Sequence, residues 1–372
     1  MRYIFALFII VFITNCSNVK TQISYKQNNI IKTPSIDKIV KNDEQNSSIV
    51  NIDKNGTKPS IQNDIEDIKK DEMIVGFSSN IIGKYGKDAL NCINSYILFK
   101  NQKYSVKVYN IEDESDETIN NLFETLDQDS DIKVLALFAT NTLENIDIKE
   151  NLKIYLPLIH TNIVTSNSNK TNILYGAIDY KKQIDRLISY SNSNNIVDLY
   201  DNSTLGNSLH KFVDKNITIF KKEVNDNNKY YNQFLSKNKK LENSTIILNT
   251  PIVKSSILLS QLSSLDIKPS VVLSTQLNYT PLILSLTQKE DRDNIIIASS
   301  IGYIPQDIIE YNILNGSDLS YNWVNYSIVV GIEYLINNNI ELFHDLNIEN
   351  NQVVYPVQLY RAGQDAFEKI SQ

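Results

Sequence analysis

Short apolar runs alternate with amphipathic segments from residue 72 almost to the end of the chain, and this alternation constrains the fold most. The run IKVLALFATN at 132–141 is continuously apolar before its polar end, as in a strand buried on both faces. The segment ETINNLFETLDQ at 117–128 instead repeats its apolar residues at helical spacing, with Ile119 and Phe123 on one face. Repeated strand–helix–strand units predict parallel sheets covered by helices on both faces.

The alternation restarts near residue 181, which indicates two similar halves. Around twelve strands are too many for one compact sheet in a chain of this length. We therefore predict an α/β protein with two doubly wound parallel-sheet lobes and a cleft between them. The first lobe is expected at about 72–180 and 302–345, and the second at about 181–301 and 346–372.

Three predictions concern particular elements of these lobes. The segment YLPLIHTN at 155–162 is expected to be a strand that follows a helix at 143–154. The segment SYNWVNYSIVVGIEYLINN at 320–338 predicts a long buried helix, because apolar residues occur on all of its faces. The ending at 351–370 is expected to form a short strand pair and a final helix.

The N-terminus, MRYIFALFIIVFITNCS, has the features of a secretion signal. Arg2 supplies a positive region, and Phe5 to Ile13 form an apolar core that is too short to span a bilayer. Cys16 follows this core, and Ile13-Thr14-Asn15-Cys16 resembles a bacterial lipobox, although Asn15 departs from the usual small residue. We expect residues 1–15 to be a lipoprotein signal peptide and Cys16 to be lipidated. The alternative is a plain signal peptide with an incidental cysteine.

Residues 16–71 differ in composition from the rest of the chain. They are rich in Asn, Ser, Lys and Asp and show no sustained apolar period. The few apolar residues cannot bury enough surface to offset the conformational entropy lost on folding. We expect a disordered, lipid-anchored linker that precedes a folded domain at 72–372. Ser17 rather than Asp follows Cys16, so by resemblance the outer membrane, facing the periplasm, is the expected location.

Short polar side chains follow many of the expected strands. In open α/β sheets, ligands bind beyond the carboxyl ends of the strands, and helix N-termini there favour anionic groups. Hydroxyl and amide side chains can donate and accept hydrogen bonds to a small polar ligand, although helix capping is the competing explanation for each. The candidate cleft residues are Ser78, Ser79, Asn80, Thr140, Asn141, Thr161, Asn162, Asp201, Ser274, Thr275 and Gln276.

The sequence contains no recognisable catalytic or metal-binding set. The three histidines, His160, His210 and His344, stand far apart, and no GxSxG, HExxH or phosphate-binding loop motif occurs. The second cysteine, Cys92, lies in an amphipathic segment, where a core position is the expected role. The net charge of −7 disfavours nucleic acid as a partner. We expect no enzyme activity, no cofactor and no metal.

Several segments resemble the periplasmic binding protein type I fold in order and spacing. They are FSSNIIGKYGKDALN at 77–91, IHTNIVTSNSN at 159–169 and YDNSTLGNSLHKF at 200–212. The segment at 77–91 stands where a Pro-Leu-Ser-Gly loop is usual, and the one at 200–212 carries Leu205-Gly206 in place of a Tyr-Gly pair. The segment at 159–169 is similar to a loop of one branch, the penicillin-binding-protein activator (LppC-like) lipoproteins. That resemblance implies an outer-membrane lipoprotein that stimulates a peptidoglycan synthase, which is itself a penicillin-binding protein.

Two functions from different classes remain open. The first is a lipid-anchored regulator of peptidoglycan synthesis that acts by protein–protein contact, which the linker and the departures from the ligand-loop motifs favour. The second is a solute-binding protein that delivers amino acids or another small polar ligand to an ABC transporter, which the two-lobed fold and the polar strand ends favour.

Overall fold

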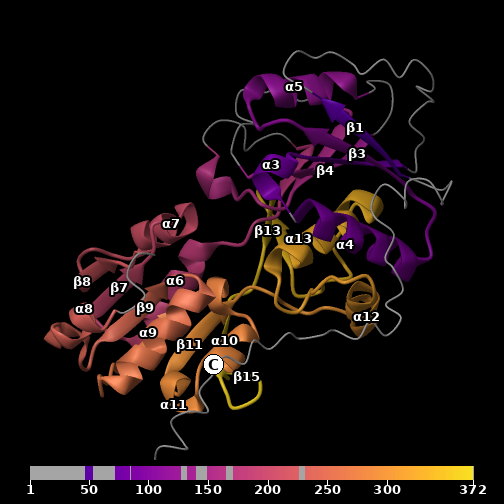
Figure 1. Ribbon diagram of the computed structural model, residues 1–372. Helices are drawn as coiled ribbons and strands as arrows, with labels where there is room; N and C mark the ends of the chain where they lie inside the picture. The colour runs from indigo at the N-terminus through magenta and orange to yellow at the C-terminus, as the bar shows by residue number, and fades with distance from the viewer. Residues whose placement is uncertain are drawn as a thin grey trace, which may run out of the picture. The chain divides into compact units, whose positions relative to one another are not determined.

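The computed structural model describes residues 47–52, 72–83, 85–126, 132–139, 149–164, 171–225 and 231–371. These residues form two β-sheets, each with helices packed on it (Figure 1). The α/β architecture with two doubly wound lobes is as predicted from the alternation of apolar runs and amphipathic segments. Each sheet is mainly parallel and ends in short antiparallel strands, a feature that the sequence pattern did not reveal.

The first sheet has the strand order β1-β3-β2-β4-β5-β6-β13-β12. All of its pairings are parallel except that of β12 with β13. In Figure 1 the yellow strand β13, from the C-terminal part of the chain, belongs to the lobe formed by the purple strands. The strands are β1 (Ser47–Ile52), β2 (Glu72–Phe77), β3 (Ser105–Ile111), β4 (Ile132–Leu137), β5 (Leu152–Leu156), β6 (Ile173–Tyr175), β12 (Asn347–Glu349) and β13 (Gln352–Val354).

Helices cover both faces of this sheet because its strands are apolar on both faces. Val75 and Leu135 belong to one hydrophobic cluster, while their neighbours Ile74 and Val134 belong to another. Successive residues of a strand point to opposite faces, so the two clusters lie on opposite sides of the sheet. The helices of this lobe are α3 (Ser79–Ile82), α4 (Tyr85–Lys100), α5 (Asp116–Thr125), η2 (Thr161–Ile163), α12 (Gln306–Leu314) and α13 (Trp323–Asn337).

Helix α13 is the predicted long buried helix, and eleven of its fifteen residues are buried. Its N-terminus is fixed by Asn322, whose side chain accepts hydrogen bonds from Val324 N and Asn325 N. Tyr96 of α4 donates a hydrogen bond to the buried carboxylate of Glu333, and Lys100 lies 3.4 Å from the same group. These polar contacts fix α4 against α13 within an otherwise apolar layer.

The second sheet has the strand order β15-β14-β11-β10-β9-β7-β8. Strands β7 to β11 are parallel, and β14 and β15 form an antiparallel hairpin beside β11. The strands are β7 (Ile196–Tyr200), β8 (Thr218–Glu223), β9 (Thr245–Asn249), β10 (Val271–Ser274), β11 (Ile295–Ser299), β14 (Gln358–Ala362) and β15 (Phe367–Lys369).

This second sheet is also buried on both faces. Val197 and Ile246 belong to one cluster, and Ile196 and Ile247 belong to another. The alternation again places helices on opposite sides of the sheet. The helices of this lobe are α6 (Tyr180–Ser191), α7 (Thr204–Phe212), α8 (Asn232–Ser236), η3 (Lys239–Leu241), α9 (Ile252–Ser264), η4 (Gln276–Asn278), α10 (Leu282–Leu286) and α11 (Lys289–Arg292).

Four expectations about individual segments are wrong. Residues 47–52, assigned to the disordered linker, form β1, which pairs in parallel with β3 along its whole length. Residues 347–354, assigned to the second lobe, form β12 and β13 of the first sheet. Residues 367–369 form β15 instead of a final helix, because they pair with β14. Strand β5 (Leu152–Leu156) begins inside the segment expected to be helical and ends well before residue 162, the expected end of the strand, because only these five residues continue the ladder of β4 and β6.

Candidate functional site

The candidate site comprises the carboxyl ends of the parallel strands, where the sequence places most of its short polar residues. In the second lobe, these strand ends carry polar side chains that are almost completely buried. Ser274 and Thr275 are 0% exposed, and Gln276 is 4% exposed. Buried polar groups are normally hydrogen-bonded, so their partners decide whether they are available to a ligand.

Asn278 connects two of these strand ends and helix α9. Its side-chain nitrogen donates toward Thr250 O at 3.0 Å, Ser255 Oγ at 3.0 Å and Ser274 Oγ at 2.7 Å. Ser274 in turn donates to Leu248 O at 2.9 Å. The predicted site residue Ser274 is therefore part of an internal hydrogen-bond network that ties the end of β10 to β9 and α9.

A second network links β10 and β11 to α6. Gln276 N donates to Gln183 Oε1 at 2.8 Å, and Gln183 Nε2 donates to Ser300 Oγ at 2.7 Å. Ser300 N donates to Gln276 Oε1 at 2.8 Å, which closes a ring of three hydrogen bonds. Thr275 caps η4 by accepting from Leu277 N at 3.5 Å. The bonding of Thr275 and Gln276 is thus mostly internal.

Three buried polar atoms among these residues have no protein partner. They are Asn249 Oδ1, Gln276 Nε2 and Asn278 Oδ1. A buried polar atom without a partner carries a desolvation cost that water or a polar ligand can remove. The second-lobe strand ends therefore retain some capacity for a small polar group, and the role of Gln276 in ligand binding stays a prediction.

Asp201 lies directly after β7 and is 3% exposed. Its Oδ1 accepts from Ser203 Oγ at 2.6 Å, and its Oδ2 lies 3.2 Å from Lys254 Nζ. A Cβ atom at Gly206 would lie only 2.0 Å from Asp201 Oδ1 and 2.6 Å from its backbone oxygen. The glycine of the Leu205-Gly206 pair is therefore needed so that α7 can pack against the Asp201 turn.

The predicted residues of the first lobe are more exposed. Ser78 is buried and donates to Glu112 O at 3.2 Å, whereas Asn80 is exposed and donates to the same oxygen at 3.1 Å. Ser79 is also exposed, and its backbone N–H donates to Asn110 Oδ1 at 2.9 Å. The structure thus brings these three residues together at the ends of β2 and β3.

Thr161 and Asn162 form the start of η2. Thr161 N donates to Gln352 Oε1 at 3.0 Å, and Asn162 N donates to His160 Nδ1 at 3.1 Å. Burial lowers the pKa of His160, and the carboxylate of Asp179, 3.9 Å away, partly opposes this effect. The side chain of Asn162 is exposed. A role for Thr161 or Asn162 in ligand binding stays a prediction. The other predicted residues, Thr140, Asn141 and Cys16, lie outside the described residues.

The sequence reasoning missed a buried cluster in β7. Asp198 is fully buried, and its carboxylate contacts His210 Nδ1 at 2.5 Å and accepts from Asn249 Nδ2 at 2.9 Å. The ring of Tyr200 stacks on His210 with centroids 4.0 Å apart. Burial raises the pKa of Asp198, and the hydrogen bond from His210 lowers it in part. The available signal was an aspartate inside the apolar run IVDLY.

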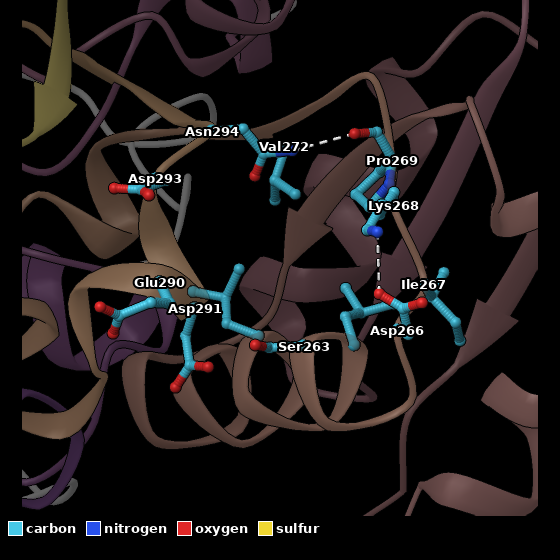
Figure 2. A pocket seen from close by; sticks show the side chains of 12 residues that line it. Ser263, Asp266, Ile267, Lys268, Pro269, Val272, Glu290, Asp291, Asp293 and Asn294 are labelled. Carbon is cyan, nitrogen blue, oxygen red and sulfur yellow. Dashed lines mark hydrogen bonds and ion pairs between the residues drawn. The ribbon is translucent and has the colours of Figure 1, made fainter.

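A pocket of about 270 Å³ lies at the opposite, amino end of β10 and β11 (Figure 2). Leu259, Leu262 and Val272 contribute apolar surface to it. Four acidic residues also line the pocket: Asp266, Glu290, Asp291 and Asp293. The carboxylate of Asp266 lies 2.9 Å from Lys268 Nζ and points toward that nitrogen in Figure 2. The acidic side chains there have structural roles in part, since Asp291 accepts from Ser260 Oγ and Gln288 N.

The described part of the chain lacks two other kinds of feature. No cluster of three or more His, Cys, Asp or Glu side chains in these residues could hold a metal ion. None of the helices formed by these residues is both long enough and apolar enough to cross a membrane.

Comparisons with known proteins identify the fold. No protein-family model and no curated protein matches the chain. Among solved structures, a Silicibacter pomeroyi protein described as a branched-chain amino acid ABC transporter matches with a TM-score of 0.60 at 9% identity, over 82% of this chain and 96% of the other. The substrate-binding protein LivJ from Streptococcus pneumoniae, in complex with isoleucine, matches with a TM-score of 0.55 at 12% identity, over 82% and 100%.

Haemophilus influenzae LpoA matches with a TM-score of 0.52 at 8% identity, over 82% of this chain and 59% of LpoA. The C-domain of LpoA is described as a regulator of PBP1A. At these identities the similarity shows the fold alone. The chain therefore has the two-lobed periplasmic binding protein type I fold, which is shared by transporter-associated binding proteins and by LpoA.

Proposed function

We propose that the protein is a non-catalytic, lipid-anchored regulator that lies in the periplasm and acts on a peptidoglycan synthase by protein–protein contact. The observation that carries this proposal is the internal bonding of the second-lobe strand ends. Ser274, Thr275 and Gln276 are almost completely buried and are held by Asn278 and Gln183. A protein that works through its outer surface needs rigid strand ends more than it needs free donors and acceptors.

The N-terminal sequence supports the same proposal. An acylated Cys16 fixes one end of the linker at the outer membrane, and the folded lobes are then held at a distance from it. LpoA, which has the same fold, is described as a regulator of PBP1A. The proposed partner of this chain is a synthase of the same kind.

The second candidate is a solute-binding protein for amino acids or another small polar ligand. It is favoured by one observation in the second lobe. Asn249 Oδ1 and Gln276 Nε2 are buried without a protein partner, and a polar ligand could satisfy them. The isoleucine complex of LivJ, which shares the fold, supports this candidate at the level of the fold.

Two measurements on the purified protein distinguish the candidates. The first is binding to a purified bifunctional peptidoglycan synthase, together with the rate of glycan polymerisation by that synthase in the presence and absence of the protein. The second is thermal unfolding in the presence of each common amino acid. The proposal predicts that the protein binds the synthase and that no amino acid raises its unfolding temperature. A ligand at about 100 times its Kd adds about 2.7 kcal/mol, so a rise of several degrees without synthase binding would favour the solute-binding candidate.

The lipid anchor is tested separately by metabolic labelling with a fatty acid. We expect label in the full chain and none in a Cys16→Ala variant. Equal labelling of the two proteins, or none in either, would remove the anchor from the proposal and leave the question of synthase binding unaffected.

A further inference from the structure

A second pocket lies between the edge strand β8 and the segment formed by α8 and η3. Its volume is about 570 Å³. Phe220 of β8 and Phe234 of α8 are half-buried and form its apolar part. Lys222, Lys237 and Lys240 are exposed and line it as well. We call these five residues and the space between them the β8 pocket.

Strand β8 also presents a sheet edge at this pocket. Among the residues that the structure describes, it is the last strand of its sheet, and it pairs with β7. Val224 N donates to Tyr200 O of β7, so Glu223 and Lys221, at alternate positions, direct their backbone groups to the other side. Ile219 shares that side, where its carbonyl accepts from Lys240 Nζ at 2.8 Å. An edge strand with outward N–H and C=O groups is a template for an additional strand.

The charge around the β8 pocket is opposite to that of the whole chain. The described residues within 214–242 contain six lysines and three acidic side chains, although the net charge of the chain is −7. A local excess of positive charge on an acidic protein attracts acidic partners to this region and orients them. The lysines are Lys215, Lys221, Lys222, Lys237, Lys239 and Lys240, and the acidic residues are Asp214, Glu223 and Glu242.

We propose that the β8 pocket binds an extended acidic segment of a partner protein, which adds to the edge of β8 as a further strand. Alternate side chains of an added strand point to one face, so apolar side chains there can contact Phe220 and Phe234. Acidic side chains on that same face of the segment pair with the three lysines, which line the pocket together with the two rings. This inference concerns the second lobe alone and does not depend on the function proposed above.

Single-stranded nucleic acid also binds to surfaces that combine lysines with aromatic rings. The structure favours a peptide for two reasons. A peptide backbone can continue the hydrogen-bond ladder of β8, whereas a sugar–phosphate backbone cannot. The net charge of −7 also repels a long polyanion, while a short acidic segment experiences mainly the local lysines.

The test uses the full chain and a rhodamine-labelled Glu-Val peptide of ten residues, in which Glu and Val take turns along one face of the extended chain and Thr occupies the other face. Fluorescence anisotropy is measured at low salt and again at about 0.3 M salt. We expect saturable binding that weakens with salt. The same peptide with Lys in place of Glu and a ten-nucleotide oligothymidylate are expected not to bind. Absence of saturable Glu-Val binding, or equal or tighter binding of either competitor, would overturn the proposal.

Two further comparisons locate the binding on the β8 pocket. The double variant Lys222→Gln and Lys237→Gln is expected to bind about fivefold to tenfold more weakly, the effect of losing two largely exposed ion pairs. The matched control, Lys182→Gln with Lys289→Gln, removes the same charge from exposed positions outside the pocket and is expected to bind like the parent. Equal weakening by both double variants would overturn the assignment to this pocket.

The strand-addition geometry has its own test. A Glu-Val peptide with N-methyl groups on alternate residues keeps its side chains but cannot donate the backbone hydrogen bonds of an added strand. Two such peptides are compared, with the methyl groups on the odd-numbered or on the even-numbered residues. We expect the one whose methyl groups lie on the side that pairs with β8 to bind at least tenfold more weakly than the unmethylated peptide. Retained affinity for both methylation patterns would overturn strand addition.

Discussion

The substitution Asn278→Asp tests whether the second-lobe strand ends form an internal network. Asn278 is 0% exposed, and its side-chain nitrogen lies 2.7–3.0 Å from three oxygen atoms. Aspartate has nearly the same shape but replaces the donor by an acceptor. Two of the three oxygens, Ser255 Oγ and Ser274 Oγ, already donate their protons to Thr250 O and Leu248 O. The new carboxylate would therefore face oxygen lone pairs.

The expected cost follows from the number of hydrogen bonds and from the burial of the charge. The nitrogen has two hydrogens, and each lost hydrogen bond costs about 1 kcal/mol. A buried carboxylate without a cationic partner adds several kcal/mol, which a shift of its pKa partly relieves. We expect the free energy of unfolding at pH 7 to fall by about 3–5 kcal/mol. This measurement is made by urea titration followed by circular dichroism at 222 nm.

The loss of stability caused by Asn278→Asp is expected to be smaller at low pH than at pH 7. Burial raises the pKa of the new carboxyl in the folded state above its unfolded value of about 3.9. The folded state therefore takes up a proton as the pH falls, and the deficit relative to the parent shrinks. The control Asn202→Asp makes the same change at an exposed position and is expected to alter stability by less than about 0.5 kcal/mol. A loss below about 1 kcal/mol for Asn278→Asp would refute the internal network.

Three other substitutions or labels test separate parts of the structure. Gly206→Ala is expected to lower the free energy of unfolding by about 1–3 kcal/mol in the same urea titration, because its Cβ would meet Asp201, and an unchanged midpoint would contradict this packing. Arg292→Met is expected to cost about 3 kcal/mol or more, because buried Arg292 donates to the carbonyls of Thr287, Gly363 and Gln364. Burial raises the pKa of the Cys92 thiol to about 12. The neutral thiol therefore favours the folded state, and stability falls as the pH rises above the unfolded value of about 8.5. Iodoacetamide at pH 8 should label Cys92 only after denaturation, as peptide mass spectrometry would show, and rapid labelling of the native protein would disprove its burial.

Local sequence patterns predicted the central strands and the long helix because those elements are apolar in themselves. The segment containing β4 reads as a buried strand without knowledge of its partners, and α13 reads as a buried helix. Half of the residues of β1 are polar and β15 has only three residues, and both pair with a strand distant in the sequence or across a turn, β3 and β14. Pairing with a distant strand leaves little trace in a local window, so these segments were assigned wrongly.

The same distinction applies to the candidate site. The position of Asp201, Ser274 and Gln276 after strands followed from the alternation of the sequence. Their burial did not, since it depends on tertiary packing; Gln276, for example, is held by Gln183, which lies 93 residues away along the chain. The contact of Asp198 with His210 joins a strand to the following helix, and a lone histidine in the sequence did not indicate it.

Crosslinking in living cells tests the central claim most directly. The full chain is expressed in a Gram-negative host, and photo-crosslinkable residues replace exposed side chains of both lobes. Captured proteins are then identified by mass spectrometry. The proposed function predicts that a bifunctional peptidoglycan synthase is captured from at least one lobe and that Cys16→Ala reduces this capture. Capture of a transporter permease without any cell-wall synthase would contradict it.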